Sequence, residues 1–129
     1  MIILATVVVT LAAVIHVAIF AMESISWAKP SVWKRFGVKS QAQADTVRPM
    51  AYNQGFYNLF LAIGAFIGVI LVGAGAHEAG GALVIFTVGS MLAASIVLIT
   101  SGRGYIRAAL IQGTVPLIAL VLFIISLVS

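Results

Sequence analysis

The chain has 129 residues, of which 63% are hydrophobic and 8% are charged, and its seven basic residues outnumber three acidic ones. Soluble domains average about half apolar and a quarter charged residues, so this composition excludes a water-soluble globular protein. It predicts instead a single membrane domain with room for four spans of about 20 residues each. The absence of cysteine excludes disulfides, thiolate metal sites and thiol nucleophiles.

The first predicted helix extends from about residue 2 to residue 27 and is apolar up to His16 and Glu23. Lys29-Pro30 ends it, because proline lacks a backbone N–H and restricts the residue before it. Residues 28–49 then form the only long polar stretch, in which aromatic residues stand among basic ones. Two interpretations of this stretch stay open: a solvated loop, or a short helix on an anionic lipid surface.

Three further helices are predicted over residues 50–72, 82–100 and 105–127. Pro49 suits the first position of the second helix, where its missing N–H would have no partner in any case. Pro116 is expected to kink the fourth helix. Turns over 73–81 and 101–104 complete the chain, so we expect an all-α membrane protein built as an up-down bundle of four transmembrane helices.

The basic residues predict how this bundle is oriented. All seven are assigned to the first and third connections, and none to the second connection or to either end. Because positive charge stays on the cytoplasmic side, connections 28–49 and 101–104 are predicted to be cytoplasmic and both termini to lie outside the inner (plasma) membrane. The basic excess then indicates membrane topology, and no nucleic-acid partner is expected.

Polar side chains gather toward this same end of every predicted helix, while the opposite halves are almost purely aliphatic. Polar groups inside a bilayer cost free energy unless they find partners, so the one-sided distribution predicts a polar cavity that faces the cytoplasm. Two stripes at helical spacing are expected to face each other across one seam: His16, Phe20, Glu23 and Trp27 in the first helix, and Asn53, Tyr57, Phe60 and Gly64 in the second.

Several of these residues have a structural as well as a functional interpretation. Glu23 is either an interfacial carboxylate that reaches water or pairs with Lys29 or Arg107, or a functional acid. His16 is either a neutral imidazole bonded to a neighbouring helix, or a proton relay or haem ligand. The asparagines that open the second helix either join helices or bind a ligand.

Three segments of the chain stand out together: residues 16–27 (HVAIFAMESISW), 53–62 (NQGFYNLFLA) and 112–116 (QGTVP). This combination resembles a bacterial family of small integral membrane proteins known only as a domain of unknown function, DUF1304. The resemblance covers nearly the whole chain. It implies a fold but no established activity.

More distantly, Asp45-Thr46-Val47-Arg48 and Asn53 followed by Leu59-Phe60-Leu61 are similar to the second helix of the MAPEG superfamily, membrane proteins of eicosanoid and glutathione metabolism. This resemblance implies four-helix protomers in a homotrimer with a long cytoplasmic first connection. That superfamily has a glutamate three residues after its asparagine, where this chain has Phe56. Glu23 would then supply the carboxylate from the first helix.

The predicted function is to bind or convert a small lipophilic substrate in a MAPEG-like manner, with Glu23 and Tyr57 as catalytic residues. The predicted ligand-binding residues are His16, Arg48, Asn53, Gln54, Asn58, Arg103, Arg107 and Gln112. The arginines would hold an anionic co-substrate such as glutathione. The alternatives are a haem protein with His16 as axial ligand, and a structural or transporter-like bundle without catalysis.

Overall fold

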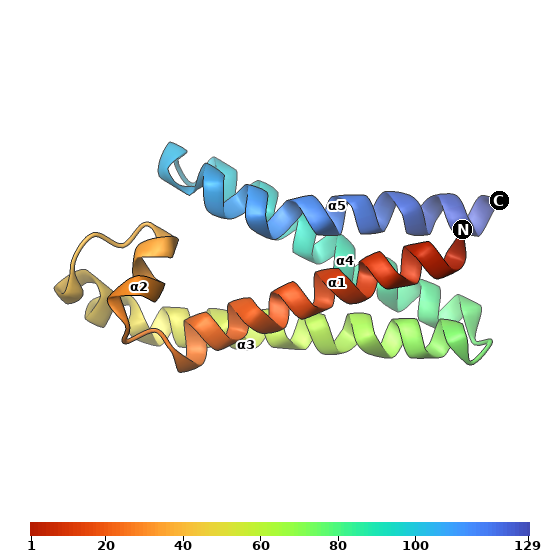
Figure 1. Ribbon diagram of the computed structural model, residues 1–129, viewed down its shortest axis with the longest axis horizontal. Coiled ribbons are helices and arrows are strands. Elements are labelled where there is room, and N and C mark those ends of the chain that lie inside the picture. The colour runs from red at the N-terminus through yellow and green to blue at the C-terminus, as the bar shows by residue number, and fades with distance from the viewer.

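The computed structural model describes every residue from 1 to 129 and contains helices but no strands (Figure 1). Four segments are long and apolar enough to cross a membrane. The structure therefore confirms the all-α fold and fits a multi-pass membrane protein. Its elements are α1 (Ile2–Phe20), the π-helical turn η1 (Ala21–Ile25), α2 (Pro30–Trp33), the 3₁₀ turn η2 (Lys34–Phe36), α3 (Gln41–Gly73), α4 (His77–Thr100), the 3₁₀ turn η3 (Arg103–Tyr105) and α5 (Ile106–Val128).

The long helices form an up-down bundle in which each one packs against two neighbours. Both α1 and α4 contact α3 and α5, so α1 and α4 lie diagonally opposite each other. The termini and the α3–α4 turn lie at one end, which we call the terminal end, whereas α2 and the α4–α5 turn lie at the other, which we call the α2 end (Figure 1). All seven basic residues belong to segments at the α2 end.

Apolar residues of all four helices fill the terminal half of the bundle. Its core cluster has 12 buried residues, among which Val9, Met91 and Phe123 are fully buried. Alanines make up much of the rest, and glycine allows α3 and α4 to approach closely, since a β-carbon at Gly80 would lie only 2.7 Å from the backbone nitrogen of Val72. The terminal half is thus a packed apolar core, and space for a ligand has to lie toward the α2 end.

The predicted start of the second long helix near residue 50 is wrong, because α3 begins at Gln41. The Ser40 hydroxyl accepts a hydrogen bond from the Gln43 backbone N–H at 3.2 Å, and the Gln43 side-chain oxygen accepts one from the Lys39 N–H at 3.0 Å. Together they cap the helix in the manner of a capping box. Pro49 consequently lies inside α3 rather than at its first position.

The early start of α3 also changes the first connection, which was predicted to run over residues 28–49. The extra helical turns dock on the end of the first span, where the Trp27 indole N–H donates to the Ala44 carbonyl at 3.0 Å. With 33 residues, α3 is about 50 Å long, which is more than the roughly 30 Å needed to cross a hydrocarbon layer. The connection contains helical α2 and η2, and so is not an irregular loop.

The α3–α4 turn is shorter than the predicted 73–81. Only residues 74–76 lie between the two helices, and α4 begins at His77. Glu78 lies in the first turn of α4, where its negative charge is favourable next to the positive end of the helix dipole.

Candidate functional site

The π-helical turn η1 continues α1 and directs Glu23 into the protein. Only 8% of Glu23 is exposed. The Asn58 side-chain amide on α3 donates to Glu23 Oε2 at 2.9 Å and to the Gln54 carbonyl at 3.2 Å. Single π-helical turns inside α-helices are frequent at functional sites. Here the turn places a carboxyl and a carboxamide from two spans in direct contact.

A close approach between η1 and α3 permits this contact. The Ser24 hydroxyl donates to the Tyr52 carbonyl at 2.8 Å, and Phe20 meets Phe56 edge to face with ring centroids 5.1 Å apart. Gly55 lies between these contacts, and a side chain there would overlap the Ser24 hydroxyl. A larger residue at this position would therefore require the Ser24 side chain, or the contact between η1 and α3, to shift.

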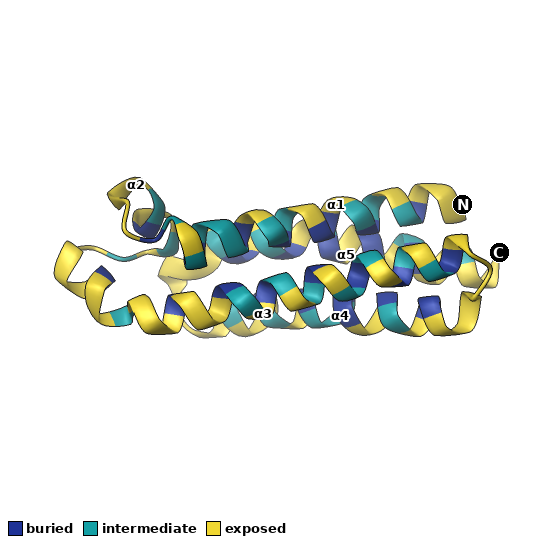
Figure 2. Ribbon diagram, turned by 90° about the horizontal axis from the view of Figure 1, so that it is seen from below, coloured by how far each residue is buried: buried dark blue, intermediate teal, exposed yellow.

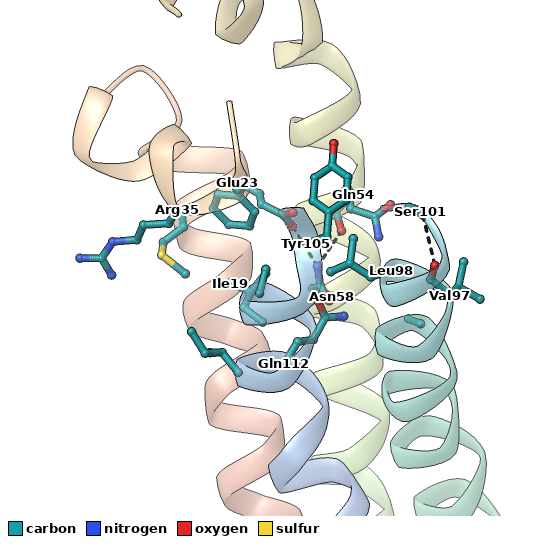
Figure 3. Close-up of a pocket in the computed structure, with 15 residues that line it drawn as sticks. Ile19, Glu23, Arg35, Gln54, Asn58, Val97, Leu98, Ser101, Tyr105 and Gln112 are labelled. Carbon is teal, nitrogen blue, oxygen red and sulfur yellow. Dashed lines mark hydrogen bonds between the residues drawn. The ribbon is translucent and has the colours of Figure 1, made fainter. Parts of the chain in front are cut away.

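The Glu23–Asn58 pair forms part of the wall of a pocket of about 480 Å³, which we call the inner pocket. All four spans and η2 contribute to it, in the region where α4 and α5 diverge from α1 and α3 toward the α2 end (Figure 1). Nine of its 15 lining residues are hydrophobic. The lining residues are Ile19, Met22, Glu23, Arg35, Phe36, Gln54, Asn58, Ala94, Val97, Leu98, Ser101, Tyr105, Ala108, Ile111 and Gln112 (Figure 3).

Four of the predicted site residues lie together in this lining: Glu23, Gln54, Asn58 and Gln112. Glu23 forms no ion pair with Lys29 or Arg107, and Asn58 is its only side-chain partner. Its second carboxyl oxygen, Oε1, accepts no hydrogen bond from the protein. An unpaired carboxyl oxygen and two carboxamide side chains are therefore available to a molecule in the inner pocket.

His16 lies outside this pocket, although it belongs to the same face of the first span. Its side chain is fully buried, and Nδ1 donates to the Ala12 carbonyl at 2.9 Å. Nε2 is buried without a partner. This bond is within α1, whereas one interpretation expected a bond to a neighbouring helix, and His16 does not line the inner pocket.

The predicted stripe on the second span faces away from α1. Asn53 is exposed, and Tyr57 and Phe60 are 57% and 59% exposed. The inward face of α3 is instead Ala51, Gly55, Asn58, Ala62 and Ala65, which recur along its buried side (Figure 2). Small residues allow helices in a membrane to approach closely, while large aromatic ones can face lipid. The predicted facing of the two stripes is therefore wrong, and no hydrogen bond joins Tyr57 to Glu23.

The predicted arginines are distributed differently from one another. Arg48 and Arg103 are exposed, and they line neither the inner pocket nor the second pocket described next. Arg107 lines a second pocket, of about 570 Å³, which we call the basic pocket. Its lining residues are Lys34, Arg35, Gly37, Gly104, Arg107, Ala108 and Ile111.

Most of the other lining residues of the inner pocket were not predicted as site residues, among them Arg35, Phe36 and Tyr105. These three come together because η2 folds back against η3, and a β-carbon at Gly37 would lie 3.4 Å from the Tyr105 ring. Gly37 has φ +79°, a left-handed conformation that favours glycine. The position of Tyr105 at the start of a span, where aromatic residues are common, was the one local signal for it. Nothing in the local pattern of residues 34–37 indicates this long-range contact.

Two of the three comparisons with known proteins gave no match, since neither a curated protein nor a solved structure matches the chain. The third gave a family model described as "Protein of unknown function (DUF1304)", which matches residues 10–124. The match spans most of the chain, including all of α3 and α4 and the larger part of α1 and α5. None of these findings supports the resemblance to the MAPEG superfamily.

Proposed function

The chain belongs to the DUF1304 family, and we propose that it binds a small lipophilic or amphipathic molecule from the membrane in the inner pocket. One observation carries this proposal: a buried carboxyl, held by a carboxamide from another span, lines a mostly apolar pocket. Glu23 orients the ligand and accepts a proton from it where a reaction follows. Asn58, Gln54 and Gln112 supply further hydrogen bonds.

Size and chemistry support this assignment. The inner pocket has about 480 Å³, within the range of about 300–1,000 Å³ that is usual for small-molecule sites. Such sites are mostly apolar with a few convergent polar groups, and the inner pocket has this composition. Acidic residues within spans are costly, and they mark functional sites by default. Glu23 is such a residue, and no cation neutralises it.

The ligand-binding test uses native mass spectrometry of the full chain, released from membranes in mild detergent. A co-purified amphipathic molecule is expected. Because a hydrogen bond to a charged group is worth about 1.5–3 kcal/mol, Glu23→Gln is expected to lower its occupancy about tenfold or more. Glu78→Gln is the matched control, since Glu78 is exposed at the terminal end. Equal occupancy in both variants, or no ligand after incubation with total lipid extract, would overturn the proposal.

We further propose that the α2 end faces the cytoplasm of a multi-pass inner-membrane protein. The support is the location of all seven basic residues at that end, since positive charge is retained inside. The chain has no cysteine, so single cysteines report orientation directly. In intact cells an impermeant maleimide is expected to label Ala74→Cys but to label Lys39→Cys only after permeabilisation. The reverse pattern would contradict this orientation.

The other functions receive less support from the geometry. His16 lines neither pocket, so a haem bound to it would require the helices to separate. The apolar core closes the terminal half of the bundle, which leaves no polar path along its whole length. A homotrimer, glutathione binding and a MAPEG-like activity stay predictions.

A further inference from the structure

We infer that the basic pocket binds the phosphate-type head of an anionic amphiphile whose single apolar chain occupies the inner pocket. This inference rests on the proposed function and names the class of ligand for it. The two pockets share a wall, because Arg35, Ala108 and Ile111 line both. The two pockets therefore adjoin, so a molecule with a charged end and an apolar end would have to cross only this shared boundary to occupy both.

The charges of the basic pocket specify the sign of the head group. Lys34, Arg35 and Arg107 line it, and no acidic residue does. The three acids of the chain are elsewhere: Glu23 in the inner pocket, Asp45 bonded to Gln41 at 2.8 Å, and Glu78 at the terminal end. Three cations without a counter-ion attract an anion.

The chemistry of the cations favours phosphate over carboxylate. Guanidinium groups donate two parallel hydrogen bonds to either anion, and Arg35 and Arg107 supply two such groups. A phosphate monoester carries about −1.5 to −2 charges near neutral pH and has three acceptor oxygens, so it matches three cations better than a singly charged carboxylate does. The Arg35 side chain extends away from Glu23, which leaves its guanidinium free of that carboxyl (Figure 3).

The relative depth of the two pockets fits an amphiphile in a bilayer. Arg107 precedes Gln112 on α5 by five residues, so it lies about 7.5 Å closer to the α2 end. A head group near Arg107 is thus at the level of the polar connections. Below it, a hydroxyl in the linker of the amphiphile would donate to Glu23, and the apolar chain would contact the hydrophobic residues of the inner pocket. The inner pocket, at about 480 Å³, has the size of a site for one small ligand, so one apolar chain is expected.

The test measures binding of amphiphiles with one identical acyl chain to the full protein in phosphatidylcholine nanodiscs. The head groups are a phosphate monoester (lysophosphatidic acid), a carboxylate (the fatty acid), phosphocholine and neutral glycerol. The phosphate monoester is expected to bind most tightly. Arg35→Gln and Arg107→Gln are each expected to weaken its binding about tenfold or more without changing binding of the neutral amphiphile. Arg48→Gln removes the same charge outside both pockets and is expected to have no effect.

Each outcome has a distinct meaning. Equal affinity for phosphate and neutral heads, unchanged in Arg35→Gln and Arg107→Gln, would overturn this inference and leave the proposed function standing. Binding of none of the amphiphiles would also overturn this inference, and the native mass spectrometry with total lipid extract then decides the proposed function separately. Inorganic phosphate is added as a competitor, and it is expected to displace the amphiphile only weakly. Complete displacement by inorganic phosphate at millimolar concentration would show that the site recognises a free anion, and would overturn the assignment to an amphiphile.

Discussion

Gly80→Val is expected to destabilise the bundle by about 3 kcal/mol, the upper part of the usual range for overpacking. A β-carbon at Gly80 would lie 2.7 Å from the Val72 nitrogen and 2.8 Å from the Gly68 carbonyl oxygen. Both atoms are backbone, so no side-chain rotation relieves the overlap and α3 has to move away from α4. Reversible unfolding in mixed micelles, followed by circular dichroism, measures the loss.

Gly89→Val is the matched control on the same helix. A β-carbon there has no neighbour within 4 Å, so only helix propensity changes, and valine is slightly better than glycine in a helix. We expect the control to be neutral or slightly stabilising. A loss at Gly80 no larger than that at Gly89 would show that the α3–α4 crossing does not depend on close backbone contact.

Depth along a span could be predicted from this sequence, because each residue of a helix adds a fixed rise of about 1.5 Å. Glu23, Asn58 and Gln112 lie at matching depths in their spans, and the structure brings them to one pocket. The direction in which a residue points was harder to predict. Nearly every position of α3 beyond residue 58 is apolar, so hydropathy does not distinguish the packed face from the outer one. The small residues distinguish the two faces, because Gly55, Ala62 and Ala65 lie on the packed face of α3.

Two local patterns indicate different starts for α3. Pro49 suggested a helix start, because its missing N–H needs no partner there. Ser40 and Gln43 give a stronger start signal, because their side chains accept hydrogen bonds from two backbone N–H groups. Arg35 and Tyr105 could not be predicted as neighbours. They meet because two connections that are far apart in the chain pack together. Such packing produces no repeating pattern of residues in either connection.

Asn58→Leu is expected to cost about 2 kcal/mol, because it leaves the Glu23 carboxyl buried without its only side-chain hydrogen bond. Asn53→Leu is the control, since Asn53 is an exposed carboxamide on the same helix, and its effect is expected to stay within about 0.5 kcal/mol. The same unfolding measurement compares the two. Equal effects would mean that the Glu23–Asn58 bond contributes nothing particular to the fold.

The double variant Glu23→Met/Asn58→Leu separates stability from function. Replacing both partners of a buried hydrogen bond by apolar groups of similar shape can be nearly neutral, so the double variant is expected to recover most of the loss caused by Asn58→Leu. The coupling energy is expected to be about 1–1.7 kcal/mol, the upper range for hydrogen bonds between spans. This well-folded protein is nevertheless expected to lose its ligand. If it binds the ligand as tightly as the native chain, the pair serves only to join two helices, and Glu23 has no part in recognition.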